Sequence, residues 1–305
     1  MVSITVDFHT HLLEKEVNPK KYWKAAKEKN LNAVAITEHF NEKPEKAYKM
    51  LAEEKPRGIC LIPGMELSTS AGHVVALGKD EGIYGIEKLF RKGLEIKKAI
   101  EVAQSEGITL SIAHPWGLSY DSAAYLLGEK KLYALVERED IGVEAFNGMF
   151  GNVSSFFYAT DWVRKPMNFF DFLETSRIGR KTRLSRLGKK GKEKLDKKGK
   201  EIIERCQKPY ELAAKAGFAT AGSDAHHPDR IGTGVTKLKA KERKPEAILK
   251  AVKDKKKVEW LGPGVKETEK GYEVEKISIQ RAEVLSGIKY ATKRAIMKKV
   301  RKKKT

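Results

Sequence analysis

Short apolar runs rich in β-branched residues alternate with longer amphipathic stretches along most of the chain. The pattern predicts strands at 3–8, 33–37, 59–62, 74–77, 110–113, 142–146 and 219–221, and helices at 19–29, 42–54, 85–105, 201–216 and 245–253. This alternation is typical of a parallel sheet covered by helices. We therefore expect an α/β fold whose reactive groups gather where strands end and loops begin.

The positive charge is concentrated in two segments. Residues 164–208 contain sixteen basic and six acidic side chains, and residues 289–305 contain nine basic side chains and no acidic one. Together they hold nineteen of the twenty excess positive charges. We expect a domain of residues 1–260 with a basic insertion at about 164–208, followed by an extension of residues 261–305 with a basic tail. Such segments either bind polyanions or remain simply solvated.

Cysteine content and hydropathy exclude two classes of protein. Two cysteines are too few for a disulfide framework, and no apolar run approaches the roughly 20 residues that span a bilayer. The first eleven residues lack the basic flank and apolar segment of a signal peptide. We expect a soluble protein of the cytoplasm with no membrane partner.

Six of the seven histidines lie at the edges of predicted strands. His9 and His11 share one face of an extended chain, because its side chains alternate with a period of two. Asp224 and His226 repeat this spacing after a later strand. The other candidates at strand edges are His39, Glu66, His73 and His114. A single histidine in such a position is usually structural, but imidazole and carboxylate at successive strand ends are what divalent metals require.

The order of these motifs resembles that of the PHP (polymerase and histidinol phosphatase) superfamily over residues 1 to about 235. The matching segments are DFHTH at 7–11, ITEH at 36–39, PGME at 63–66, GHV at 72–74, AHP at 113–115, EAFN at 144–147 and GSDAH at 222–226. The resemblance implies a distorted (β/α)7 barrel with two or three divalent ions in a cleft, hydrolysing phosphate esters. Mn, Zn and Fe all accept this set of nitrogen and oxygen donors.

The resemblance also implies a set of ligands for each ion. The first set is His9, His11, Glu66 and Asp224; the second is Glu66 with His73 and His114; the third is His39 and His226 with an acidic residue after the first motif. This chain departs from the family pattern at two positions where aspartate is usual. Glu38 precedes His39, and Glu16 stands at the acidic position of the third set, with Glu14 as a nearer competitor.

Three polar residues are further candidates for the chemistry. Asp7 is predicted to orient a ligating imidazole, and Glu144, together with Asn147, to do similar work. Ordinary hydrogen bonding at a strand end is the alternative for all three. Arg230, four residues after His226, is suited to bidentate contact with a substrate phosphate, although a surface salt bridge would explain it equally well.

The leading function is metal-dependent hydrolysis of a phosphomonoester or phosphodiester in a nucleotide or nucleic acid. Adjacent divalent ions activate water and stabilise the attacking and leaving oxygens, so no serine or cysteine nucleophile is needed. The basic segments favour RNA or single-stranded DNA as a partner. The alternatives are a small-metabolite phosphatase acting on a compound such as histidinol phosphate, and a catalytically idle scaffold that binds nucleic acid. An amidohydrolase-type barrel also fits the His-x-His pair, but an evident bridging lysine is lacking.

Overall fold

A nine-stranded sheet of order β7-β6-β5-β4-β3-β2-β1-β8-β9 forms the centre of the computed structural model. The structure describes residues 1–117, 120–150, 189–190, 193, 208–254, 258–261, 265–268 and 271–274. Its strands are β1 (Val2–Thr10), β2 (Ala33–Ile36), β3 (Cys60–Thr69), β4 (Gly72–Leu77), β5 (Thr109–Ile112), β6 (Gly142–Asn147), β7 (Ala219–Gly222), β8 (Val235–Ala240) and β9 (Val258–Leu261). A separate hairpin joins β10 (Val265–Thr268) to β11 (Gly271–Val274). The basic tail and nearly all of the predicted basic insertion lie outside the described residues.

The prediction of a parallel sheet holds for β1 to β3 and for β5 to β7, but it is wrong for β4. This strand runs antiparallel to both of its neighbours. The reason is that β3 continues to Thr69 and turns within two residues into β4, and so short a connection joins only antiparallel strands. Gly72 lies at this turn with φ of 89°, and a Cβ there would lie 2.3 Å from the carbonyl oxygen of Asp121.

The first and seventh strands close the sheet at their carboxyl ends into a nearly complete, distorted barrel. The amino-terminal half of β1 pairs with β8, whereas Thr10 at its end forms a parallel bridge with Ala225, just after β7. The amide of Asp224 donates to the carbonyl of His9 at 2.7 Å. Gly222 makes this approach possible, because a Cβ at that position would lie only 2.4 Å from the Cβ of His9.

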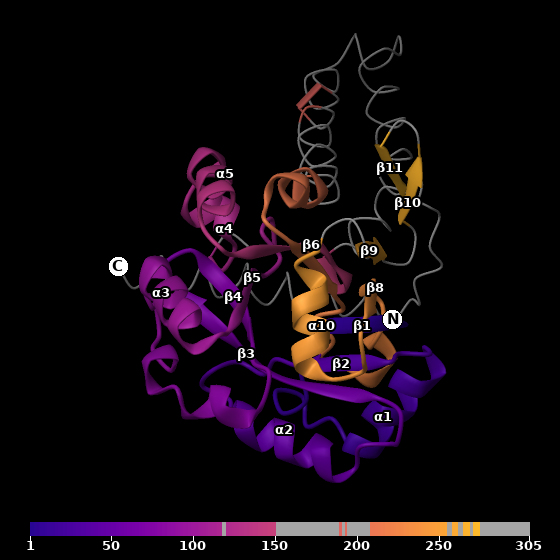
Figure 1. Ribbon diagram of the computed structural model, residues 1–305. Helices are drawn as coiled ribbons and strands as arrows, with labels where there is room; N and C mark the ends of the chain where they lie inside the picture. The colour runs from indigo at the N-terminus through magenta and orange to yellow at the C-terminus, as the bar shows by residue number, and fades with distance from the viewer. Residues whose placement is uncertain are drawn as a thin grey trace.

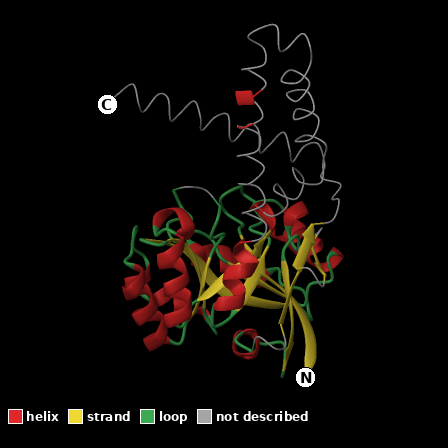
Figure 2. Ribbon diagram, turned by 90° about the horizontal axis from the view of Figure 1, so that it is seen from above, coloured by secondary structure: helices red, strands yellow, loops and turns green. Residues whose placement is uncertain are grey.

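The helices cover the outside of the sheet (Figure 2). They are α1 (Pro19–Glu28), α2 (Pro44–Glu53), α3 (Ile96–Glu106), α4 (Ala123–Leu126), α5 (Glu129–Arg138) and α10 (Pro245–Val252), with short 3₁₀ turns η1 (Glu81–Gly85), η2 (Glu87–Leu89) and η3 (Pro228–Arg230). In Figure 1, α1 and α2 lie along β2 and β3, while α3, α4 and α5 lie beside β4 and β5. No described helix is both long and apolar enough to cross a membrane.

Local sequence signals explain where several helices begin. Asn18 caps α1, its side chain accepting from the amides of Lys20 and Lys21, and proline occupies the first turn of α1, α2 and α10. The predicted helix at 85–105 is only partly correct, because its first half forms η2 and a turn before α3 begins at Ile96. The apolar faces of the helices bury against the sheet in three clusters of apolar side chains.

Candidate metal centre

The alternation of side chains along β1 places two histidines together at the rim of the barrel. Ile4, Val6 and Phe8 join an apolar cluster, while His9 and His11 lie on the opposite face of the strand. Both imidazoles are 1% exposed, and their Nε2 atoms are 3.2 Å apart. The prediction that the pair shares one face is confirmed.

Four side-chain atoms converge at this rim, from β1 and the residue after it, from the interior of β3 and from the loop after β7. The Nε2 atom of His9 lies 3.7 Å from both Glu66 Oε2 and Asp224 Oδ1. The Nε2 atom of His11 lies 3.6 Å and 3.4 Å from the same two oxygens. Donors held tetrahedrally at about 2.0–2.2 Å from a zinc-sized ion are separated by roughly 3.3–3.6 Å. The spacing of His9, His11 and Glu66 therefore fits one divalent ion, and Asp224 Oδ1 lies at a similar distance from both imidazoles.

Glu66 occupies the middle of the histidine cluster. Its Oε1 lies 2.9 Å from His73 Nδ1 and 3.1 Å from His114 Nε2, while its Oε2 lies 2.9 Å from His39 Nδ1. The residue is 2% exposed and lies within β3. One carboxylate thus contacts both the first group of donors and a second group, which is the arrangement that a bridging ligand requires.

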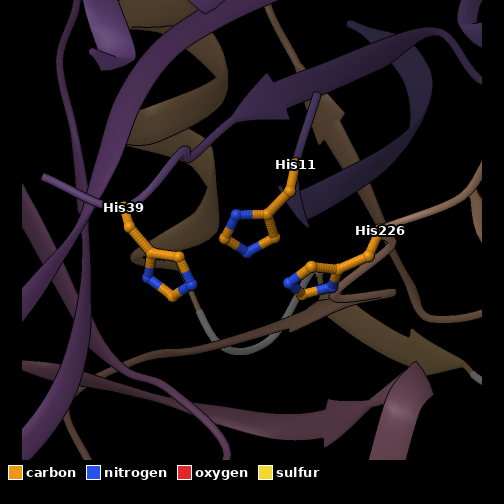
Figure 3. Close-up of side chains that lie close together, drawn as sticks. All are labelled: His11, His39 and His226. Carbon is orange, nitrogen blue, oxygen red and sulfur yellow. The ribbon is translucent and has the colours of Figure 1, made fainter. Parts of the chain in front are cut away.

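Near the histidines of the predicted third group lies Glu14, the nearer competitor of Glu16. The Oε2 atom of Glu14 lies 2.6 Å from His226 Nε2 and 3.5 Å from His39 Nε2. In Figure 3 the imidazoles of His11, His39 and His226 point toward a common centre, and the three can offer nitrogen atoms within 4.8 Å of one another. Glu16 is exposed with φ of 50°, and no contact with a histidine is found for it among the described residues. Of the two candidates, Glu14 is therefore the one that contacts the histidines of this group.

Glu144 and Asn147 form hydrogen bonds with several of the candidate ligands. One oxygen of Glu144 lies 3.2 Å from His9 Nδ1, and the other accepts from the amide of His114 at 2.7 Å. Asn147 donates to Glu144 at 2.9 Å and to Asp224 at 3.2 Å. A carboxylate behind a ligating histidine fixes the orientation of its ring.

Asp7 has a different partner set from the one predicted. Its carboxylate accepts from the amides of Ser223 and Gly232, each at 2.8 Å, and from that of His9 at 3.3 Å. These bonds tie β1 to the loops after β7, so the predicted contact with an imidazole is replaced by contacts with backbone amides. Complete burial raises the pKa of Asp7 to about 6, in spite of these hydrogen bonds.

Glu38 is a site residue whose role was not foreseen from the sequence. One of its oxygens accepts from the amides of Leu12 and Leu13 at 2.8 Å and 2.6 Å, and the other lies 3.4 Å from His11 Nδ1. The side chain is fully buried. It therefore holds both a candidate ligand and the start of the loop that carries Glu14. The available signal was an acidic residue immediately before His39.

Two candidate ligands adopt backbone conformations that are rare for residues other than glycine. His114 has φ of 28° and Asp224 has φ of 52°. Such conformations cost about 1–3 kcal/mol each and persist where surrounding contacts enforce them. Here the amide of His114 donates to Glu144, and that of Asp224 donates to the carbonyl of His9.

The electrostatic field of the centre favours positive charge. Burial alone would raise the pKa of Glu66, but the nearby imidazoles, His73 foremost, hold it well below its usual range. Burial would lower the pKa of His9, but Asp224, Glu144 and Glu66 hold it well above its usual value. Divalent ions would take the place of these protons, since a ligating imidazole is neutral.

Arg230 lies at the end of η3, which begins two residues after His226, and is half-buried. Its predicted contact with a substrate phosphate stays a prediction.

Comparison with known proteins supports the assignment of the fold. A family model described as PHP-associated matches residues 204–256. The uncharacterized protein MJ1587 of Methanocaldococcus jannaschii is 30% identical over 129 residues, which is 42% of this chain and 66% of that protein. The match therefore spans just under two thirds of this relative.

Two solved structures share the architecture. PsfC from Pseudomonas syringae PB-5123 has a TM-score of 0.51 at 16% identity, over 86% of this chain and 92% of PsfC. The lesion-specific endonuclease PfuEndoQ from Pyrococcus furiosus has a TM-score of 0.50 at 16% identity, over 87% of this chain and 61% of PfuEndoQ. At this identity the likeness establishes the fold. The predicted α/β barrel class is confirmed, although the sheet has nine strands and not the seven of a (β/α)7 barrel. The match to the PHP-associated model supports the resemblance to PHP proteins.

Proposed function

We propose that this chain is a hydrolase of phosphate esters that uses two or three divalent ions, and that nucleotide or nucleic-acid phosphodiesters are among its substrates. The observation that carries the proposal is the spacing of the donor atoms of His9, His11, Glu66 and Asp224. The two imidazoles lie 3.2 Å from each other and 3.4–3.7 Å from the two carboxylate oxygens, which suits a single ion.

The ligand sets follow from the contacts of the centre. The four residues just named would hold one ion, and Glu66 would share a second with His73 and His114. A third would lie between His39, His226 and Glu14. Bound divalent ions of this kind lower the pKa of water and act as Lewis acids toward phosphoryl oxygens.

The protein's own side chains then position the reacting groups. Glu144 fixes the ring of His9, and Glu38 fixes that of His11, so the donor atoms keep their spacing. In the overall reaction the oxygen of a water molecule forms a bond to phosphorus, and the ester P–O bond breaks. One proton of the water passes to the solvent or to the leaving oxygen, so atoms and charge balance without a covalent enzyme intermediate.

Nucleic acid is the favoured substrate class for two independent reasons. The basic segments 164–208 and 289–305, which lie almost entirely outside the described residues, carry the charge that phosphate backbones attract. In addition, PfuEndoQ, which shares the fold, is an endonuclease.

The proposal is tested by metal-dependent turnover. Protein stripped with a chelator and reloaded with Mn²⁺, Zn²⁺ or Fe²⁺ would be assayed on bis-p-nitrophenyl phosphate, p-nitrophenyl phosphate, histidinol phosphate and labelled RNA. We expect hydrolysis of the diester or of RNA in at least one loaded form and none in the stripped form. Protein that binds two or more ions but hydrolyses none of these compounds would contradict the proposal and favour an idle scaffold.

A further inference from the structure

A groove of about 430 Å³ begins at Phe40, the residue that follows the candidate ligand His39. It is lined by Phe40, Asn41, Lys43, Pro44, Glu45, Lys46, Tyr84 and Phe90. The volume is within the range of small-molecule sites. We refer to it as the aromatic groove.

The aromatic groove is fixed directly to the candidate metal centre by the backbone. Phe40 follows His39, and its amide donates to the carbonyl of Glu66 at 3.0 Å. On the opposite side, the hydroxyl of Tyr84 accepts from the amide of Gly64 at 3.1 Å, so this ring is also anchored to β3. Two rings of the groove are therefore held by backbone contacts with β3, the strand that carries the candidate ligand Glu66.

The lining of the groove combines aromatic surface with positive charge. Phe40, Tyr84 and Phe90 are half-buried, so each ring packs against the core and still has accessible surface. Lys43 and Lys46 are exposed, and neither forms an ion pair with another described residue. The single acidic side chain in the lining, that of Glu45, is paired with Lys49 at 2.6 Å. The groove is thus suited to a flat ring next to an anionic group.

We propose that the aromatic groove binds the nucleobase of the substrate, with Lys46 and Lys43 beside a phosphate that flanks that base. The inference rests on the proposed function and narrows it to nucleotide substrates. Aromatic side chains hold bases of any sequence, because every base has a π face, and lysine neutralises the backbone at the same time. A small sugar phosphate or histidinol phosphate would leave the groove empty.

The base contribution is measured by titrating the full-length, metal-loaded protein with AMP, UMP and ribose 5-phosphate, with phosphate release monitored so that intact ligand is analysed. Stacking of one base predicts that both nucleotides bind about 5- to 150-fold more tightly than ribose 5-phosphate. Phe90→Leu, which keeps apolar volume but removes a ring, should reduce this preference several-fold and leave ribose 5-phosphate binding unchanged. Tyr133→Leu, which removes a half-buried ring of the same apolar cluster outside the groove, should not alter it.

Equal affinities for the three ligands, or a preference that survives Phe90→Leu, would overturn the assignment of the groove. Turnover of bis-p-nitrophenyl phosphate in the same preparations separates this failure from that of the proposed function. If the protein hydrolyses the diester but shows no base preference, the nucleobase site in the groove is wrong and the proposed function stands. If the protein shows a base preference that Phe90→Leu removes but hydrolyses nothing, the proposed function is wrong and the nucleobase site stands.

The charge contribution is measured with a 5′-phosphorylated dinucleotide at several salt concentrations. Lys46→Ala should lower the slope of log affinity against log salt by about 0.7, because the variant neutralises one phosphate fewer. Lys49→Ala is the matched control, since it lies on the same helix and is paired with Glu45. Equal slopes for the two variants would remove Lys46 from the proposed site.

Discussion

The choice between Glu14 and Glu16 as the acidic member of the third ligand group gives the sharpest test of the centre. Both lie in one loop two residues apart, and the family pattern alone favours Glu16. Both residues are exposed, but Glu14 contacts His226 and His39, whereas no contact with a histidine is found for Glu16 among the described residues. Glu14→Gln and Glu16→Gln remove the same charge and keep the same shape, so each variant controls for the other.

The expected magnitude follows from the exposure of Glu14. Two unit charges about 4 Å apart attract by ~4 kcal/mol at an effective dielectric constant of 20 and by ~1 kcal/mol in water. The Glu14 side chain is 31% exposed, which places it between these limits. A loss of about 2–3 kcal/mol corresponds to an affinity for the third ion that is about 30- to 150-fold weaker. Glu16→Gln should change it less than twofold.

The assay is equilibrium dialysis against a graded series of free Mn²⁺ or Zn²⁺, followed by elemental analysis of the protein. In Glu14→Gln one ion per chain should dissociate at concentrations at which the unaltered protein retains it, and the remaining ions should be unaffected. Circular dichroism would verify that both variants keep the fold. Loss of an ion in Glu16→Gln with full retention in Glu14→Gln would refute the assignment, as would unchanged binding in both.

Further predictions concern the bridging ligand, its support, the closure of the barrel and the basic tail. Glu66→Gln should lower turnover of bis-p-nitrophenyl phosphate by more than the 10- to 100-fold typical of a residue that only hydrogen-bonds to a metal ligand. Its circular dichroism spectrum should be unchanged, and near-normal turnover would reject the bridging position of Glu66. Glu144→Gln should lower turnover or metal affinity by about 10- to 100-fold, and an unaltered value for both would contradict its orienting role. Gly222→Ala should lower the free energy of unfolding by about 1–3 kcal/mol. Gly217→Ala is the control: no atom lies within 4 Å of the added methyl group, so the change should be less than about 0.5 kcal/mol. Equal denaturation midpoints for the two variants would show that the backbone around Gly222 shifts to accommodate the methyl group. Deletion of 289–305 should flatten the salt dependence of RNA binding by about 0.7 for each phosphate that the tail neutralises, and equal slopes would exclude the tail from binding.

Most of the ligand positions were predictable because their signals are local. His9 and His11 share a face through the period of a strand, and His39 and His114 lie two or three residues after the short strands β2 and β5. These relations depend only on chain geometry within a few residues. The same is true of the helices that begin at proline, whose bounds in the structure lie within about two residues of those expected.

The errors arose where tertiary contacts override local signals. The predicted strand at 59–62 stops before Pro63 and Gly64, but both residues lie within β3. Pro63 needs no amide partner there, and a Cβ at Gly64 would lie 2.7 Å from the carbonyl oxygen of Ala76 on β4. The strand therefore extends to Thr69, and Glu66 lies inside it. The direction of β4 follows from this extension, which no periodicity in the sequence reveals.

The selection of Glu14 depends on a contact that spans several elements. Glu38, at the end of β2, binds the amides of Leu12 and Leu13, and so sets the path of the loop after β1. That path brings Glu14 to His226, which follows β7. Glutamate at position 38 reaches these amides with one more methylene group than the aspartate usual in the family. We infer that the longer side chain at position 38 and the acidic residue at position 14 are coupled, since Glu38 sets the path of the loop that carries Glu14.

Glu38→Asp would then withdraw the carboxylate from the two amides and lower the affinity for the same ion whose binding Glu14→Gln weakens. In the double variant the loss should be smaller than the sum of the two separate losses, because both act on one loop. Strictly additive losses in the dialysis assay would show that the two positions act independently.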